Sequence, residues 1–181
     1  MCAYYPESKV EINGFTAKYY DIILDIITFA VYSSLIQKAI RLMSIKSNDR
    51  IIDLGAGTGR NACLMMTYLS TKGELIGLDI SNVMIAQFKR KCAGLINAKI
   101  IKQRIDKPLP YEDEFDKAFI SFVLHGFPQE VRRQIIRNAF KALKKHGEFF
   151  ILDYNEFSVK EMPSYLKILF KLIECPYAFD F

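Results

Sequence analysis

Three glycines at alternate positions are the residues of this sequence best suited to holding a ligand. Residues 50–61 read RIIDLGAGTGRN, so Gly55, Gly57 and Gly59 follow a short apolar run and precede a helix-like one. Backbone without side chains lets a ligand approach closely, and the free N–H groups at a helix start favour an anionic group. The run ELIGLD then ends at Asp79, whose carboxylate can accept two hydrogen bonds from a ribose diol. Together the two features predict a nucleoside-bearing ligand with an anionic group.

The spacing of the glycines narrows the class of nucleoside. A dinucleotide fingerprint has the form GxGxxG, but Arg60 occupies the position of its third glycine. The chain also has no GK[ST] sequence, which a nucleoside-triphosphate loop requires. A nicotinamide-dependent oxidoreductase is an alternative with the same fold, but it conflicts with this spacing.

Four motifs, in the right order, resemble those of class I S-adenosylmethionine-dependent methyltransferases. DLGAGTG is similar to the first motif of that family, and LIGLDIS is similar to its ribose motif. RIDKPLPYEDEFDKAFIS resembles the adenine-contacting loop with the fourth strand, and FKALKKHGEFFILDY resembles the turn and strand that follow. The resemblance covers about residues 48–155. Within the family, AKYYDIIL and ISFVLHGF are similar to the ubiquinone/menaquinone-biosynthesis type of small-molecule methyltransferase.

The resemblance implies S-adenosylmethionine as the cofactor and a set of residues that bind it. These residues are Tyr20, Asp53, Gly55, Ala56, Gly57, Gly59, Asp79, Ile80, Met84, Ile105, Asp106, Ser121 and Phe122. Some of them have structural alternatives. Asp53 has a strand-end hydrogen-bonding role as an equal alternative, and Met84 and Tyr20 are equally suited to a core position. The segment Arg104-Ile105-Asp106 is one residue out of step with the family pattern, so either Asp106 contacts the adenine amino group or Ile105 only packs on the ring.

His125 follows the fourth strand, where the resemblance places it at the mouth of the methyl-transfer pocket. A neutral imidazole there can take a proton from a substrate hydroxyl, and a packing or surface histidine is the alternative. Methyl transfer from a sulfonium needs mainly positioning, so an enzyme does not depend on this base. The apolar N-terminal helix and residues 163–173 favour a small apolar or aromatic substrate such as a quinone.

Strand-like and helix-like sequence patterns that alternate along the chain predict an α/β fold in one domain. Strands are expected at 50–54, 74–79, 98–102, 115–122 and 148–153, and helices at 14–44 with a break near 32–34, 59–70, 81–95, 128–145 and 159–175. Gly147 is expected to end the fourth of these helices. The result is a Rossmann-like, doubly wound, mostly parallel sheet with helices on both faces, lacking the final strand pair. We divide the domain 1–181 into a helical cap (1–47), a cofactor-binding core (48–155) and a C-terminal helix (156–181).

Composition limits the partners. The formal charge is +5, but the basic residues are spread along the chain, which argues against nucleic acid. Four cysteines without a CxxC pair argue against a zinc site or a disulfide framework and suit a reducing cytoplasm. No leader opens the chain, and the longest apolar stretch, 22–35, is too short and mixed for a membrane span.

The fifth strand would leave an edge exposed, so we expect either a shortened chain or a second copy covering that edge. A catalytically incomplete, cofactor-binding partner subunit is therefore the alternative function.

Overall fold

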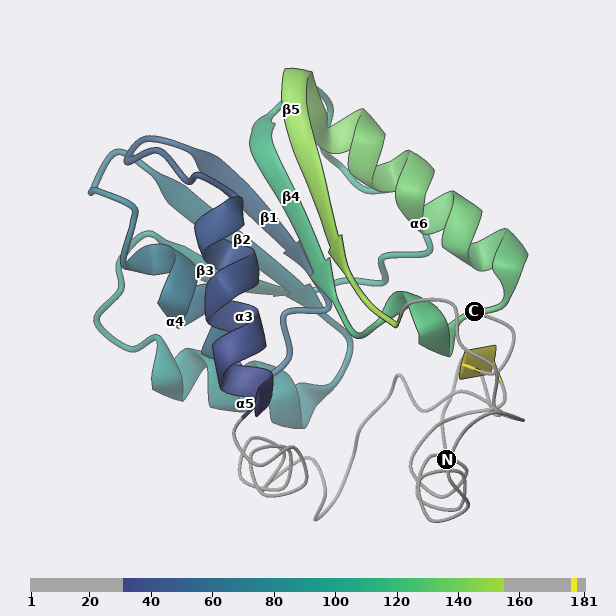
Figure 1. The fold of residues 1–181 in the computed structure, drawn as a ribbon, viewed down its shortest axis with the longest axis horizontal. Coiled ribbons are helices and arrows are strands. Elements are labelled where there is room, and N and C mark those ends of the chain that lie inside the picture. The colour runs from purple at the N-terminus through teal and green to yellow at the C-terminus, as the bar shows by residue number, and fades with distance from the viewer. Residues whose placement is uncertain (1–30, 155–176, 179–181) are drawn as a thin grey trace.

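A computed structural model describes residues 31–154 and 177–178 of the chain. In this part, helices and strands alternate except between β3 and β4, which no helix separates (Figure 1). The elements are α3 (Val31–Leu42), β1 (Arg50–Leu54), α4 (Arg60–Met66), β2 (Glu74–Asp79), α5 (Asn82–Lys91), β3 (Ala98–Lys102), β4 (Phe115–Ser121), the 3-10 helix η1 (Leu124–Gly126), α6 (Gln129–Ala142) and β5 (Leu143–Leu152). The predicted Tyr20 and the helix predicted at 159–175 lie outside the described residues.

The strands form one parallel sheet in the order β3-β2-β1-β4-β5. The order reverses next to β1, so the loops after β1 and β4 open on either side of this switch point. Helices α3, α4 and α5 lie on one face of the sheet and α6 lies on the other (Figure 1). The predicted α/β, doubly wound class is confirmed for the described residues.

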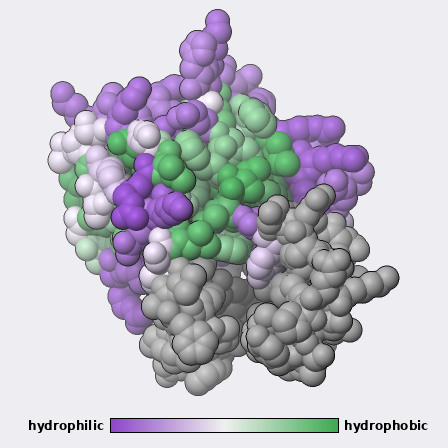
Figure 2. Space-filling view, in the orientation of Figure 1, coloured by the Kyte–Doolittle hydropathy of each residue, from purple (hydrophilic) through white to green (hydrophobic). Residues whose placement is uncertain are grey.

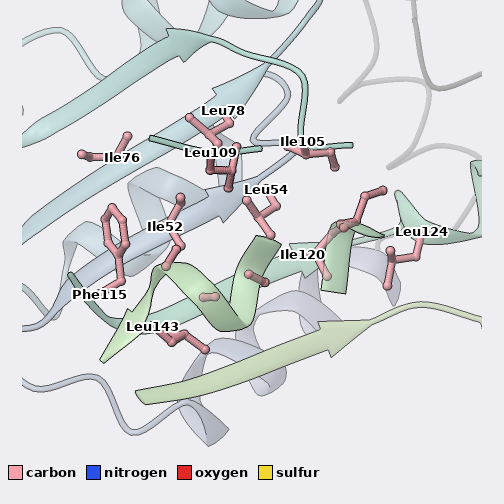
Figure 3. Close-up of a cluster of buried hydrophobic side chains, with 14 of the residues drawn as sticks. Ile52, Leu54, Ile76, Leu78, Ile105, Leu109, Phe115, Ile120, Leu124 and Leu143 are labelled. Carbon is pink, nitrogen blue, oxygen red and sulfur yellow. The ribbon is translucent and has the colours of Figure 1, made fainter. Parts of the chain in front are cut away.

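Strand alternation explains how both faces of the sheet are buried. Ile51 packs with α3, α4 and α5, whereas its neighbour Ile52 packs with α6. On the α6 side, Ile52 and Leu54 of β1 meet Ile76 and Leu78 of β2 (Figure 3). Runs of consecutive apolar residues in these strands are therefore typical of a sheet covered on both sides.

Several helix ends differ from the sequence-based expectations. Helix α6 ends at Ala142 and not at residue 145, because Leu143 already pairs with Phe115 at the start of β5. Residues 144–147 then form a bulge, after which Glu148 pairs with Lys117. Gly147 lies in this bulge, so the prediction that it ends the helix was wrong.

Three further boundaries were misplaced. Helix α3 runs through residues 32–34, so the break predicted there was wrong. Helix α4 ends at Met66, where the Thr67 hydroxyl donates to the Leu64 carbonyl. Helix α5 ends at Lys91, four residues before the predicted end, and the chain turns at Gly94 with a φ of +94°.

Strand β5 lies at the edge of the sheet within the described residues. Figure 2 shows an apolar area on the face of the molecule that carries α3 and β5. On this face of β5, Phe150 and Leu152 are only partly buried against the cluster formed with α3 and α4. The expectation that a second copy covers this edge remains a prediction.

Candidate cofactor and methyl-transfer site

The glycine loop between β1 and α4 uses its three glycines in two different ways. All three have positive φ, at +81°, +55° and +82° for Gly55, Gly57 and Gly59. A Cβ atom on Gly55 would lie 2.7 Å from Val123, and one on Gly59 would lie 2.8 Å from Phe88. At Gly57 the nearest atom within the described part of the chain would be the Gly55 carbonyl oxygen, 4.0 Å away. Two glycines therefore allow close packing inside the protein, and Gly57 is where the loop leaves room for a ligand.

Asp79 holds the glycine loop in place. Its Oδ2 accepts the Gly57 N–H at 2.9 Å, and its Oδ1 accepts the Ser81 N–H at 2.8 Å. Burial raises the pKa of Asp79, although these N–H groups partly oppose the shift. The loop and the predicted ribose residue are thus brought together. A carboxylate has about four lone-pair sites, so Asp79 can accept a further hydrogen bond beside those from Gly57, Ser81 and Ile80.

The remaining loop positions pack tightly against β2. The N–H groups of Gly55 and Ala56 both donate to the Leu78 carbonyl, at 2.9 and 3.0 Å. Ala56 is buried, and its methyl group occupies the space that a side chain at Gly77 would need. Ile80 is half-buried beside Asp79. These contacts fix the position of the loop relative to the second strand.

Asp53 lies under the loop as a buried carboxyl group. Its side chain is almost completely inaccessible, and Oδ2 has no hydrogen-bond partner among the described residues. Burial, with a contribution from the Asp79 carboxylate, raises the pKa of Asp53 to about 7. A second buried oxygen without a hydrogen-bond partner in the described part of the chain is Oδ1 of Asn61, in α4. Two acceptor oxygens are therefore available to a donor near the loop.

Ser121 and Phe122, at the end of β4, lie beside the glycine loop. The Asn61 amide donates to the Ser121 hydroxyl at 2.9 Å, and Ser121 is buried. Phe122 follows with a φ of +52°, a conformation that a bulky residue rarely adopts. Its ring lies 5.7 Å from that of Tyr154, edge to face. The predicted pocket residues Ser121 and Phe122 thus lie between the glycine loop and the end of β5.

The predicted adenine residues have partners inside the protein. Ile105 is buried in the apolar cluster beneath α6, and its carbonyl accepts the Asn138 amide at 2.8 Å. Asp106 pairs with Arg104, whose Nε donates to Oδ1 at 3.0 Å. Met84 is buried in the first turn of α5, and its N–H donates to the Ser81 hydroxyl. Roles of these residues toward a nucleoside remain predictions.

His125 is paired with a carboxylate that the sequence analysis did not single out. Its Nδ1 lies 2.7 Å from Oδ1 of Asp153, which directly follows β5. The Asp153 side chain is 3% exposed and the His125 side chain 12% exposed. Asp153 also accepts the backbone N–H groups of His125 and Tyr154, at 3.3 and 2.9 Å. The centroid of the Tyr154 ring lies 4.8 Å from that of the imidazole, so an aromatic ring packs against the pair.

Arg132 of α6 fixes the turn that carries His125. Its buried guanidinium donates to the carbonyl groups of Leu124, His125 and Tyr177, at 3.2, 3.3 and 2.6 Å. Neither Arg132 nor Asp153 was predicted. A carboxylate directly after a strand was a usable signal for Asp153, since the same signal pointed to Asp79. For Arg132 the sequence gives no signal, because it lies within a polar helix.

Similarity to known proteins agrees with this arrangement. The family model described as a methyltransferase domain matches residues 45–177. The chain belongs to this methyltransferase family. The domain is 25% identical to a ubiquinone/menaquinone biosynthesis C-methyltransferase of Proteus mirabilis, over 77% of this chain and 56% of that protein. It is 29% identical to a 2-phytyl-1,4-naphtoquinone methyltransferase of Synechococcus elongatus, over 76% and 59% of the two chains.

A solved structure supports the same fold. A TehB-like methyltransferase from Corynebacterium glutamicum superposes with a TM-score of 0.61 at 19% identity, over 77% of this chain and 73% of that one. The predicted membership of the class I S-adenosylmethionine-dependent methyltransferases, and S-adenosylmethionine as the cofactor of that class, are confirmed. The methyltransferase domain spans about three fifths of the length of the curated relatives. In its described part, no helix combines the length and apolar character that crossing a bilayer requires.

Proposed function

We propose that this methyltransferase domain transfers a methyl group from S-adenosylmethionine to a hydroxyl-bearing, quinone-like small molecule, with His125 accepting the proton that the acceptor loses. The observation that carries the proposal is the contact between His125 and Asp153 at the carboxyl edge of the sheet. This is the edge on which the glycine loop and Asp79 also lie. The names of the quinone methyltransferases among the relatives support the class of acceptor.

The polar groups near the loop suit this cofactor. S-adenosylmethionine carries an ammonium group. Its N–H groups can donate hydrogen bonds to the oxygens of Asp53 and Asn61 that have no partner among the described residues. Gly57 leaves room for close approach of the methionine portion, and Asp79 can accept a further hydrogen bond from a ribose hydroxyl. When bound, the cofactor supplies an electrophilic methyl group on a sulfonium.

The pair of His125 and Asp153 suits proton transfer. When the Asp153 carboxylate accepts from Nδ1–H, as the 2.7 Å contact allows, Nε2 of the neutral imidazole carries the lone pair that can take a proton. Two backbone N–H groups hold the carboxylate, and Arg132 holds the carbonyl of His125, so the imidazole has a defined orientation. A hydroquinone must lose a proton whether its oxygen or its ring carbon is methylated, so this role does not depend on the atom methylated. Such a base contributes about 10²–10⁴-fold to the rate.

Cofactor binding is tested first. S-adenosylhomocysteine is titrated calorimetrically into the wild-type protein and the Asp79→Asn variant, with circular dichroism to establish that both are folded. We expect binding to the wild type and marked weakening in the variant, since one carboxylate oxygen is replaced by an amide donor. A folded wild-type protein that binds NADH and not S-adenosylhomocysteine would refute the proposal.

The catalytic part is tested with His125→Asn, Asp153→Asn and His146→Asn. The acceptors are a benzohydroquinone and a naphthohydroquinone, and transfer of a labelled methyl group is measured. His146 is the matched control, because it lies in the bulge at the start of β5 with a φ of +89°, which asparagine tolerates. We expect kcat to fall about 10²-fold or more for His125→Asn, less for Asp153→Asn, and not for His146→Asn. Binding of cofactor without transfer to any acceptor would favour the incomplete partner subunit instead.

A further inference from the structure

Two of the four cysteines meet directly behind the glycine loop. Cys63 lies in the first turns of α4, and Cys92 follows the last residue of α5. Their Sγ atoms are 3.1 Å apart although 29 positions separate them in the sequence. A disulfide bond has an S–S distance of about 2.05 Å, so a relative shift of about 1 Å would join them. Both thiols are free in this structure.

The two thiols differ in their access to solvent. Cys63 is half-buried and lines a cavity of about 280 Å³ between α3, α4 and α5, which Arg60 and Lys91 also line. Cys92 is buried, with 5% of its surface exposed. Burial and the neighbouring Cys63 raise the pKa of Cys92 to about 12. A small oxidant therefore reaches Cys63 first, and Cys92 is placed to react with the product.

We propose that Cys63 and Cys92 are a redox modification site that forms a reversible disulfide with a hydroperoxide as oxidant. The Cys63 thiol attacks the peroxide oxygen and becomes a sulfenic acid, with one water released when hydrogen peroxide is the oxidant. The Cys92 sulfur then displaces the sulfenic hydroxyl group, which leaves as a second water with the Cys92 proton. Two thiols are thus oxidised to one disulfide, and one peroxide is reduced to two waters. A dithiol reverses the reaction by thiol–disulfide exchange.

The bond would connect to the loop through Gly59. The Gly59 carbonyl accepts the Cys63 N–H at 2.9 Å and lies 3.8 Å from the Cys92 sulfur. Gly59 also packs against Phe88 and Cys92 so closely that a Cβ atom would lie 3.2 Å from the Cys92 sulfur. Drawing the two sulfurs together should therefore shift Gly59, the loop residue that directly precedes α4. We therefore expect the oxidised protein to bind S-adenosylhomocysteine more weakly. This effect on binding rests on the proposed function, but formation of the disulfide bond does not.

The test uses the full chain treated with hydrogen peroxide and then with iodoacetamide. Peptide mapping by mass spectrometry should find peptides containing Cys63 and Cys92 joined, lighter by two hydrogen atoms, and separated again by dithiothreitol. The variant Cys2→Ser/Cys175→Ser should give the same bond, and Cys63→Ser should give none. A protein in which both thiols stay alkylatable, or in which Cys63 joins Cys2 or Cys175 instead, overturns the proposal.

The effect on the loop has its own readout. S-adenosylhomocysteine is titrated into reduced, oxidised and re-reduced protein, with Cys63→Ser treated in parallel. The expected result is weaker binding after oxidation, recovery after reduction and no change in Cys63→Ser. Equal affinity of the bridged and reduced forms would refute the effect on the loop. If the reduced protein does not bind at all, the proposed function fails, whereas the peptide map still decides whether the bond forms.

Discussion

The buried carboxyl of Asp53 makes a specific prediction about stability. Burial raises its pKa from 3.8 to about 7, with the Asp79 carboxylate adding to the shift. Between these two values, the folded protein holds a proton that the unfolded chain has lost. Because the folded pKa is raised, the stabilisation is fully present below pH 3.8 and is lost as the pH rises through about 7.

The size of the effect follows from the shift. In this window the free energy of unfolding should fall by about 1.4 kcal/mol per pH unit, which sums to about 4 kcal/mol. Asparagine has nearly the same shape as aspartate but does not ionise. Asp53→Asn should therefore be less sensitive to pH and, above neutral pH, more stable than the wild type by up to this amount. Asp79 has a raised pKa as well, from burial, so a shallower slope of the same sign should remain in the variant.

Urea unfolding at a series of pH values between about 5 and 8 measures this difference. Asp116→Asn is the matched control, because the Asp116 carboxylate is stabilised in the folded state. Burial acts against it, but the Arg50 N–H and the Lys144 ammonium lower its pKa. Its stabilisation is present above pH 3.8 and is lost at lower pH, so Asp116→Asn should lower stability yet keep the wild-type slope between pH 5 and 7. Equal slopes in the wild type and Asp53→Asn would refute the reasoning.

Four further predictions concern the loop, the turn at His125 and cofactor binding. Gly57→Ala should lower the free energy of unfolding by about 1 kcal/mol, because alanine at positive φ is strained. The loss of binding free energy for S-adenosylhomocysteine should be larger than this loss of stability. Gly59→Ala should lower the melting temperature further, because the new methyl group would overlap the Phe88 ring. Arg132→Met should destabilise the protein by about 3 kcal/mol in urea unfolding, since three carbonyl groups lose a buried donor. Titration of S-adenosylhomocysteine in buffers of different ionisation enthalpy should show proton release below about pH 7, because an ammonium beside Asp53 favours its ionised form, and Asp53→Asn should abolish that release.

The strands were predictable because their signal is local. A buried parallel strand is a short apolar run bounded by a glycine or an acidic residue, and residues 50–54 and 74–79 match that pattern. The end of α6 was not predictable in this way. Two lysines and a histidine continue a helical pattern after Ala142, but pairing of Leu143 with Phe115 overrides local preference.

The partner of His125 was missed for a different reason. The two residues of the pair are 28 positions apart in the sequence, and they meet only because β5 lies next to β4 in the sheet. The sequence predicts that both strands exist, but the contact depends on how closely the turn after β4 returns to the end of β5. That turn contains Phe122 at a φ of +52° and is held by Arg132 through the His125 carbonyl, and neither feature has a signal in the sequence.

The charges at the edge of the sheet also bear on the choice of cofactor. Asp53 and Asp79 lie at the end of β1 and β2, and Asp153 follows β5, so three strand ends carry carboxyl groups. A dinucleotide would bring a pyrophosphate toward this edge, and two like charges about 4 Å apart repel by about 4 kcal/mol at an effective dielectric constant of about 20. A ligand with a sulfonium and an ammonium group reverses the sign of that interaction. Replacing the carboxylates by amides should therefore weaken binding of S-adenosylmethionine more than binding of S-adenosylhomocysteine, which differs from it only in lacking one methyl group and the sulfonium charge. Equal weakening of the two affinities would mean that the carboxylates act only through hydrogen bonds.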